Sequence, residues 1–315
     1  MGVSGSSSTD QTEGVEVEAP VLGVDIGGSR VKAVVLAGGR ILARHEEPRN
    51  KPITEVLSRL VESIEDEHHI TALGVGIAGL VDHRVGRFVW GPHLSDEDID
   101  VSGHLDSLIE SHVVENDANC AAYAEWVTGP AAGHRVALTV SVGTGIGAGL
   151  VVDGAVWRGS GFAGEVGHIR MTDADLECPC GRSGCWETVV SGRQLGMEAA
   201  RLGLQPTAEA LVMAARTGFR PASDALRDAG DWLGAGITSL ILVLDPGVVV
   251  VAGGVSAAGD LILDAARERI ASGLPGAMHR PAVELAQSSH GRWAAAIGAA
   301  HLAARGRAPE RFVET

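Results

Sequence analysis

From residue 21 onward, short apolar runs alternate with glycine-rich or polar segments. The apolar run Val21–Ile26 stops at Gly27-Gly28 and a second run, Val31–Leu36, follows at once, so we expect two strands joined by a tight turn. Apolar side chains recur at helical spacing over Ile53–Ile64, which predicts an amphipathic helix. The next elements expected are two strands and a helix, at Leu73–Ala78, Val113-Val114 and Asn119–Val127.

The opening pattern returns in the second half of the chain. The run Val136–Val142, the turn Gly143–Gly147 and the run Ala148–Val152 again predict strand, glycine turn and strand. The first strand ends at residue 26 and its counterpart at residue 142, an offset of 116. Chance likeness of two glycine hairpins is one interpretation. We favour the other, which is duplication of a phosphate-binding domain.

The last third of the chain predicts two strands and two helices. Strands are expected over Leu240–Leu244 and Val248–Ala252, with Asp245-Pro246-Gly247 as the turn between them. Helices are expected around Leu261–Ile270 and over the alanine-rich stretch Arg292–Ala304.

These elements predict an α/β protein with two domains. Residues 1–19 are rich in Ser, Gly and Glu and lack periodicity, so they are expected to form a disordered tail. We expect a small N-terminal domain over 20–120, joined by a C-terminal helix over 292–305. A larger C-terminal domain is expected over 121–291.

Composition and charge exclude several classes of function. Of 315 residues, 45% are hydrophobic and 21% charged, as in a soluble globular protein. The formal net charge of −15 disfavours broad attraction to nucleic acid or to an anionic membrane. No apolar run approaches the ~20 residues of a membrane helix, and residues 1–19 lack the apolar core of a secretory signal. We therefore expect a cytoplasmic enzyme or binding protein.

Both glycine turns suit a phosphate group. Glycine lets successive backbone N–H groups approach phosphate oxygens, and Ser29 and Thr144 add hydroxyl donors. Neither turn has the ending of a Walker loop or the spacing of a Rossmann loop, so each one taken alone is as consistent with an ordinary hairpin. Asp25 precedes the first turn, where it can hold Mg²⁺ directly or through water, or bond to its own turn.

A carboxylate lies at a predicted helix entrance. The sequence Glu115-Asn116-Asp117-Ala118-Asn119 stands between a strand and a helix, so either Asp117 or Asn119 would suit an N-cap. Amide or carboxyl side chains at four of these five positions are more than an N-cap requires. An aspartate at that place can accept a proton from a substrate hydroxyl while Asn116 orients that hydroxyl.

A cysteine cluster predicts a metal site. Cys178, Cys180 and Cys185 follow His168 by ten to seventeen positions, and three sulfurs with one imidazole form a closed tetrahedral zinc site of the structural kind. Reduced thiols or a disulfide are the alternatives. Cys120 is expected to be a buried helix thiol.

Two glutamates flank the expected zinc loop over 168–187. Glu165 precedes His168 by three residues and Glu187 follows Cys185 by two, so a zinc ion would hold both carboxylates near one spot. Polar groups around a small cavity are what a polyhydroxylated ligand needs, because an unmet hydroxyl is costly. Without zinc, both glutamates would be ordinary surface charges.

Together these motifs resemble the ROK family of repressors and sugar kinases, in particular its glucokinase branch. The resemblance runs from about residue 21 to 304 and covers nearly everything except the tail. The segments that carry it correspond to the family's DIGGTK, ENDAN and GTGIG motifs, its zinc-and-sugar motif and its adenosine-side motif: Asp25–Arg30, Glu115–Asn119, Gly143–Gly147, Gly164–His168 with CPCGRSGCWE, and Ala252–Val255.

The resemblance implies a fold and a set of roles. The fold would be that of sugar kinases, actin and Hsp70 (ribonuclease H-like), with a deep cleft between two α/β domains. Asp117 would be the catalytic base of ATP-dependent phosphorylation of a hexose, most simply the 6-hydroxyl of glucose, with Mg²⁺ and structural Zn²⁺ as cofactors and a homodimer or homotetramer as the assembly. The sugar would contact Asn116, Asp117, Glu165, His168 and Glu187. The ATP site would comprise Asp25, Gly27, Gly28, Ser29, Arg30, Gly143, Thr144, Gly145, Gly253 and Gly254.

One departure from the family pattern concerns the sugar. Where glucokinases of the family carry Pro-Asn-Leu, this chain has Pro92-His93-Leu94, and Ser95–Asp100 replaces a stretch that contains tryptophan. A neutral imidazole offers one donor and one acceptor and is bulkier than an amide, so His93 keeps fructose, mannose or N-acetylmannosamine open as substrates. His93 as an exposed loop residue is the other interpretation. A sugar-sensing regulator and polyphosphate as donor are weaker alternatives.

Overall fold

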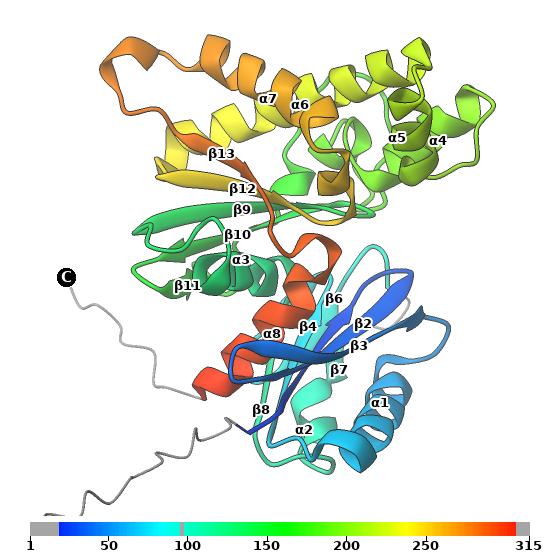
Figure 1. Ribbon diagram of the computed structural model, residues 1–315, viewed down its shortest axis with the longest axis vertical. Coiled ribbons are helices and arrows are strands. Elements are labelled where there is room, and N and C mark those ends of the chain that lie inside the picture. The colour runs from blue at the N-terminus through cyan, green and yellow to red at the C-terminus, as the bar shows by residue number, and fades with distance from the viewer. Residues whose placement is uncertain (1–18, 95–97, 307–315) are drawn as a thin grey trace, which may run out of the picture.

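The computed structural model describes residues 19–94 and 98–306 of the chain (Figure 1). The first 18 residues of the expected tail lie outside the described residues, as do residues 95–97 of the stretch after His93. Two α/β halves lie one above the other in Figure 1 and are joined by two helices. Within the described residues, no helix is long and apolar enough to cross a membrane.

The N-terminal half is built on a five-stranded sheet of order β3-β2-β1-β4-β8. β1 and β2 form the predicted antiparallel hairpin, and β4 and β8 extend the sheet in parallel. Apolar residues of helix α1 pack on one face of this sheet. The bounds are β1 (Val21–Ile26), β2 (Arg30–Ala37), β3 (Arg40–Pro48), α1 (Ile53–His68), β4 (Ala72–Ile77), α2 (Val101–Leu105) and β8 (His112–Asn116). A three-stranded side sheet contains β5 (Leu80–Asp82), β6 (Arg87–Trp90) and β7 (Ile99–Asp100).

The C-terminal half repeats that sheet. Its order is β11-β10-β9-β12-β13, with an antiparallel hairpin, β9 and β10, followed by two parallel neighbours. Helices cover its outer face at the top of Figure 1. The bounds are β9 (Val136–Val142), β10 (Ile146–Val152), β11 (Ala155–Trp157), α4 (Gly192–Arg201), α5 (Ala208–Arg216), α6 (Arg220–Leu244), β12 (Val248–Ala252), α7 (Asp260–Gly273) and β13 (Glu284–Gln287).

One predicted strand is wrong. Leu240–Leu244 is the last part of α6, a helix of 25 residues, and not a strand. Its apolar run is the continuation of a helical stripe in which Leu226, Leu233, Ile237 and Ile241 are buried. Five apolar residues alone do not distinguish a strand from the end of a buried helix. The helical spacing of the buried residues before them indicates the helix.

Two helices lie between the sheets: α3 (Asp117–Thr128) on the inner face of the second sheet and α8 (Ala294–Arg305) on that of the first (Figure 1). They cross in close contact. A Cβ on Gly298 would lie 1.7 Å from the carbonyl oxygen of Cys120, and one on Gly74 would lie 1.9 Å from that of Ala299. Only glycine permits these approaches, so backbone packs directly on backbone at the helix crossing, at Gly298, and between α8 and strand β4, at Gly74.

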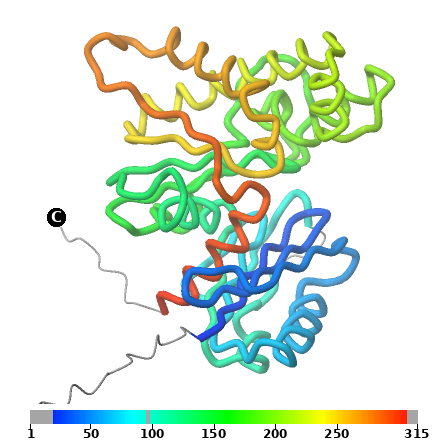
Figure 2. Tube along the Cα trace, in the orientation of Figure 1, coloured from blue at the N-terminus to red at the C-terminus, as the bar shows by residue number. Residues whose placement is uncertain are grey.

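The chain passes between the halves twice, as the trace in Figure 2 shows: once from β8 into α3, and once from β13 into α8. The second passage is tied back to α3. Buried Glu125 accepts hydrogen bonds from the hydroxyl of Ser288 and from the backbone N–H of Ser289, the latter at 3.3 Å. Both connections therefore converge on the same pair of helices.

Candidate active site

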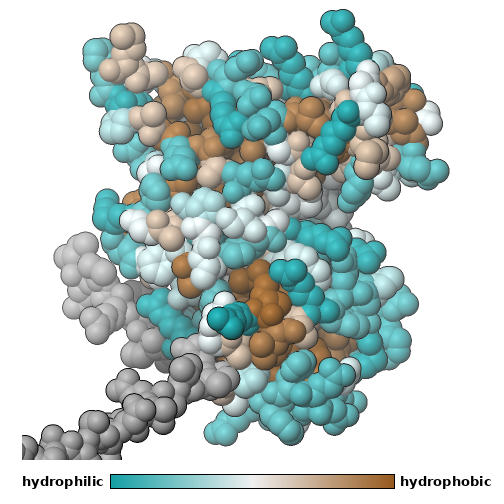
Figure 3. Space-filling view, viewed as in Figure 1, coloured by the Kyte–Doolittle hydropathy of each residue, from teal (hydrophilic) through white to brown (hydrophobic). Residues whose placement is uncertain are grey.

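A cavity of about 480 Å³ lies between the two halves. Figure 3 shows two largely polar lobes that meet at a narrower waist. Both glycine turns, the entrance of α3 and the segments around Glu165 and Glu187 line the cavity. It is therefore lined by nearly every site residue that the sequence indicated, from segments far apart along the chain. The nominated residues that line it are Asp25, Gly27, Gly28, Ser29, Arg30, His93, Asn116, Asp117, Gly143, Thr144, Gly145, Glu165, His168, Glu187, Gly253 and Gly254.

The first turn joins β1 to β2, and a hydrogen bond of 3.0 Å from Gly27 N–H to Arg30 O closes it. Asp25 stands at the end of β1 with only 5% of its surface exposed. Its Oδ2 accepts a hydrogen bond from Lys32 Nζ at 2.7 Å, so the carboxylate is paired with a cation across the hairpin. Lys32 also lines the cavity, and the sequence reasoning missed it.

The second turn joins β9 to β10 and is crowded by side chains. Gly143 N–H donates to Gly145 O at 2.9 Å. A Cβ on Gly145 would lie 2.4 Å from Glu187 Oε2 and 3.1 Å from His93 Nε2. His93 thus reaches from the N-terminal half to the second turn, and its own Cβ lies within 2.7 Å of where a Cβ of Gly28 would be. His93 stands between the two turns rather than on an exposed loop.

The entrance of α3 is capped by Asn116 and not by Asp117 or Asn119. Asn116 Oδ1 accepts from Asn119 N–H at 3.0 Å, and its Nδ2 donates to Gly79 O at 3.0 Å. Because Asn116 provides the cap, Asp117 has one oxygen bonded to the next N–H, that of Ala118 at 2.9 Å, and its carboxyl borders the cavity.

The carboxyl of Asp117 has an unusual affinity for protons. Burial is the main reason that its pKa is raised to about 7, and the negative charges of Asp25 and Glu165 add to the effect. A carboxyl with a pKa near neutrality can take up a proton and give it back at working pH, which is the requirement for a general base.

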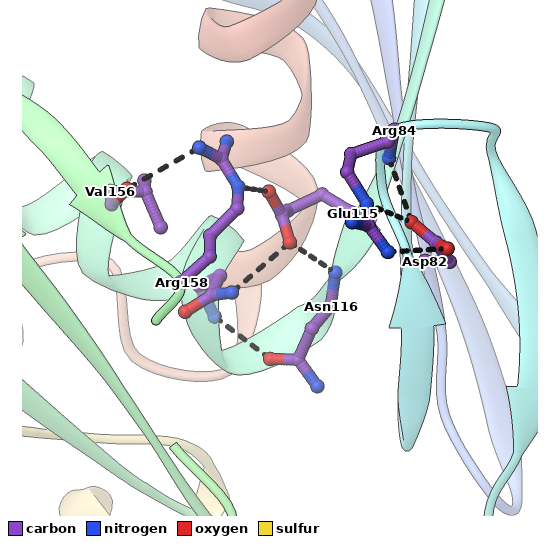
Figure 4. A network of polar contacts seen from close by, with 7 residues as sticks. Asp82, Arg84, Glu115, Asn116, Val156 and Arg158 are labelled. Carbon is purple, nitrogen blue, oxygen red and sulfur yellow. Dashed lines mark hydrogen bonds and ion pairs between the residues drawn. The ribbon is translucent and has the colours of Figure 1, made fainter. Parts of the chain in front are cut away.

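An ion pair between the halves holds the strand that leads to Asp117. Arg158 follows β11 in the C-terminal half, and its Nε donates to Oε2 of Glu115 on β8 at 2.6 Å. The other oxygen of Glu115 accepts from Asn116 N–H at 2.9 Å and from Asn119 Nδ2 at 3.0 Å. Figure 4 shows Arg158 and Asn116 converging on this carboxylate. Sequence reasoning missed Arg158, because no local pattern links residues 43 positions apart.

The predicted metal ligands meet at one place. One ligand atom each from His168, Cys178, Cys180 and Cys185 lies within 4.8 Å of all the others. Cys180 Sγ and Cys185 Sγ are 3.7 Å apart, as are Cys178 Sγ and His168 Nδ1. A tetrahedral zinc ion with bonds of about 2.3 Å to sulfur needs sulfurs about 3.8 Å apart, so the group fits zinc. Burial, with a hydrogen bond to Glu187, raises the pKa of the Cys178 thiol.

His168 also stands between the two glutamates. Its Nε2 is 3.9 Å from Glu165 Oε2 and its Nδ1 is 4.0 Å from Glu187 Oε1. Burial raises the pKa of Glu165, although His168 opposes the shift. Burial lowers the pKa of His93, whose Nε2 is enclosed without a hydrogen-bond partner among the described residues. These four side chains, two glutamates and two histidines, form a polar wall with hydrogen-bond donors and acceptors that are available to a ligand.

A further cation of the cavity comes from the second passage of the chain. Arg292 Nη2 lies 2.7 Å from Glu46 Oε2, and Arg30 pairs with the other oxygen of the same carboxylate. Both arginines line the cavity and keep about half of their side-chain surface exposed. No sequence pattern indicates Arg292, because it is far along the chain from the first turn.

Known proteins resemble this chain over nearly its whole length. The ROK family model matches residues 21–306. A glucokinase of Streptomyces coelicolor is 35% identical over 90% of this chain and 96% of that protein. A xylose repressor of Bacillus subtilis is 27% identical over 88% of this chain and 75% of that protein.

Solved structures agree with the fold. The crystal structure of a ROK family glucokinase from Streptomyces griseus, in complex with glucose and AMPPNP, superposes with a TM-score of 0.85. It is 32% identical and the match covers 91% of this chain and all of that one. A ROK hexokinase from Thermus thermophilus gives a TM-score of 0.71 at 33% identity, over 89% of this chain and 96% of that one. The predicted two-domain α/β fold with a cleft is confirmed.

Proposed function

The chain belongs to the ROK family, and from that premise we propose that it is an ATP-dependent hexose kinase that phosphorylates the 6-hydroxyl of glucose. The observation that carries the proposal is the carboxyl of Asp117, whose pKa is about 7, in a cavity that both glycine turns also line. Sugar kinases of the family, including glucokinases, are similar over nearly the whole chain, which supports ATP and a sugar as the substrates.

On the sugar side, the proposal assigns hydroxyl contacts to Asn116, Glu165, His168 and Glu187, with His93 beside them. Carboxylates accept from hydroxyls, and the amide and imidazole groups both donate and accept. Zinc on His168 and the three cysteines would hold these groups in place, because a ligated imidazole has a fixed orientation. This role is structural, since four protein ligands leave no open position for a reacting water.

On the nucleotide side, the proposal assigns the phosphates to the two turns and the adenosine to the segment around Gly253 and Gly254. Mg²⁺, bound with the nucleotide, would neutralise charge on the phosphate oxygens. Asp25 is the carboxylate suited to hold it, since it is buried beside the first turn and its one partner among the described residues is Lys32. Ser29 and Thr144 add hydroxyl donors to the N–H groups of the turns.

The chemistry assigned to these residues is an in-line transfer. Asp117 takes the proton of the sugar hydroxyl as the hydroxyl oxygen bonds to the γ-phosphorus and the bond from that phosphorus to the β,γ-bridging oxygen breaks. ADP leaves with the bridging electron pair. Positioning of the two substrates and neutralisation of phosphoryl charge supply most of the acceleration in such reactions.

The experiment is an ADP-release assay with ATP and glucose, mannose, fructose or N-acetylmannosamine. We expect glucose to give the highest kcat/KM. Because Asp117 is the proposed base, Asp117→Asn should lower kcat by about 10²- to 10⁴-fold while calorimetry shows glucose still bound. Asp228→Asn, on the exposed face of α6, is the matched control and should change neither quantity.

Two outcomes would contradict the proposal. No ADP release with any hexose would remove the kinase function, and near-wild-type turnover of Asp117→Asn would remove Asp117 as the base. A preference for mannose or another hexose over glucose would keep the kinase and reassign the sugar. His93, enclosed between both turns, is the residue that gives such a preference a physical basis.

A further inference from the structure

Lysine is rare in this chain, and one of its two lysines lines the cavity. The sequence holds 25 basic residues of the Lys and Arg type, of which only Lys32 and Lys51 are lysines. Lys51 is exposed and pairs with Glu55 one helical turn away. Lys32 has only 16% of its side chain exposed and lines the cavity beside the first turn.

The hairpin fixes the place of Lys32. Strands β1 and β2 pair so that Asp25 and Lys32 are direct cross-strand partners, which points both side chains to the same side of the sheet. The ammonium donates to Asp25 Oδ2 at 2.7 Å, and Asp25 is its one acceptor among the described residues. An ammonium has three N–H donors, so further donors remain for a ligand in the cavity.

The charge of Lys32 also reaches Asp117. The positive charge of Lys32 opposes the burial and the acidic neighbours that raise the pKa of Asp117. The ammonium therefore stands within electrostatic range of the proposed base as well as beside the phosphate turn. Lys32 and Asp117 line the same cavity, so the ammonium is placed to act on a phosphoryl group that moves from the turns toward a hydroxyl at Asp117.

We propose that Lys32 is a catalytic residue that binds the terminal phosphoryl group of the nucleotide during transfer, an inference that rests on the proposed kinase function. The ammonium donates hydrogen bonds to the oxygens of the γ-phosphoryl group while their charge redistributes, and it remains protonated throughout. The proton of the sugar hydroxyl goes to Asp117, and the electron pair of the broken P–O bond leaves with ADP. Lys32 adds a net positive charge, which the backbone N–H groups of the two turns do not carry.

A purely structural role predicts something different. If Lys32 only neutralises buried Asp25, its loss should weaken the binding of all nucleotides by the same factor. It could instead lower the stability of the protein without changing the ratio of the nucleotide affinities. If Lys32 binds the terminal phosphoryl group, its loss should weaken the binding of a nucleoside triphosphate and leave the affinity for a diphosphate nearly unchanged. Affinities for ADP and for the non-hydrolysable analogue AMPPNP separate the two roles.

The test compares wild type, Lys32→Met and Lys51→Met by calorimetry, with excess EDTA and again with Mg²⁺. For Lys32→Met we expect AMPPNP to bind about tenfold or more weakly and ADP less than about twofold more weakly, with kcat lower by about 10²- to 10³-fold. Lys51→Met removes the same charge outside the cavity and should match wild type. Lys32→Arg, which keeps the charge, should recover part of the AMPPNP affinity.

Equal losses for ADP and AMPPNP, or no loss for either, would overturn the assignment of Lys32. Wild-type protein that binds neither nucleotide would instead overturn the proposed kinase, so the two failures are distinct. If Lys32→Met does not fold, Asp25→Asn combined with Lys32→Met removes both members of the pair and allows the same comparison against Asp25→Asn alone.

A second readout needs no turnover. Reductive methylation with [¹³C]formaldehyde labels only Lys32, Lys51 and the terminal amine, and the spectrum of Lys32→Met assigns the Lys32 signal. AMPPNP should shift that signal much more than ADP does. Equal shifts with both nucleotides would count against contact with the terminal phosphoryl group.

Discussion

Asp117 illustrates at the scale of one residue how placement gives a carboxyl its chemistry. Its neighbour Asn116 performs the capping that an aspartate at a helix entrance would otherwise perform, so Asp117 is left facing the cavity. Burial and two acidic neighbours then raise its pKa to about 7. The same placement that suits Asp117 to proton transfer makes its ionised form costly in the folded protein.

That cost gives a prediction about stability and pH. The pKa of Asp117 is about 7 in the folded protein against an ordinary value of 3.8. Below pH 4 the carboxyl is protonated in both states. Between pH 4 and 7 only the unfolded chain ionises freely, so the contribution of Asp117 to folding falls as pH rises and is fully unfavourable above pH 7.

Asp117→Asn removes this penalty, so the variant should gain stability over wild type as pH increases. We expect its advantage in unfolding free energy, from urea denaturation, to be about 2–3 kcal/mol larger at pH 8 than at pH 5. The wild-type kcat/KM should rise with pH and level off above about pH 7. An advantage of the same size at both pH values would show that Asp117 has an ordinary pKa.

Residues with a local signature were predictable and residues that act across the fold were not. Asp117 and the four residues of the candidate metal group, His168, Cys178, Cys180 and Cys185, stand in short motifs. Lys32 could have been found, because the hairpin register that pairs residues 26 and 31 also pairs 25 and 32. Arg158 reaches Glu115 from the other half of the molecule, a contact that only the folded chain reveals.

Elements with turn residues at both ends were predicted well, and β1, β9 and β12 have the bounds read from the sequence. The strand expected over Leu240–Leu244 failed because a 25-residue helix ends in the same kind of apolar run that makes a buried strand. Strand β3 was also missed, because its residues alternate between half-buried and exposed positions with many charges. Hydrophobic pattern thus identifies buried strands more readily than edge strands.

The loop over 168–187 gives a prediction at the scale of an element, because it has little regular structure of its own. Zinc on His168 and the three cysteines should be what holds Glu165 and Glu187 beside the cavity. We expect one zinc ion per chain by mass spectrometry. Its removal by chelation, or Cys180→Ala, should weaken glucose binding by about tenfold or more and change AMPPNP binding little.

Cys120→Ala is the control for that measurement, since Cys120 lies on α3 outside the metal group. It should retain the zinc ion and the affinity for glucose. If the protein without zinc binds glucose as tightly as wild type does, the metal does not hold the sugar-binding residues in place.

For the whole molecule, the two sheets share one strand order and the same strand directions. The cavity between them is complete only when both halves contribute, since Asp25 and Asp117 come from the first sheet's side and Glu165 and Glu187 from the second. The ion pair of Arg158 and Glu115 is a partly buried connection between the two halves, with 16% and 3% of the two side chains exposed.

Arg158→Met should therefore destabilise the protein by about 3 kcal/mol, because it leaves the carboxylate of Glu115 buried without its cation. It should also lower kcat, since Glu115 holds the backbone next to Asp117. Arg84→Met is the matched control, because the pair of Arg84 with Asp82 beside it in Figure 4 is exposed and its loss should cost under about 0.5 kcal/mol.

The comparison is made by urea denaturation, and Glu115→Gln combined with Arg158→Met should regain part of the lost stability. Equal effects of Arg158→Met and Arg84→Met would show that the buried pair contributes no more than a surface pair.

The contact between Gly298 and the backbone of Cys120 should limit how the two lobes can move. Helices α3 and α8 can rotate about this contact point. Neither helix can slide along the other, because a side chain would then collide with a backbone carbonyl. Opening of the cleft should therefore be a scissor motion with its pivot at this crossing. Spectroscopic labels at the far ends of the lobes would travel the widest arc, while a pair beside the pivot would keep its separation.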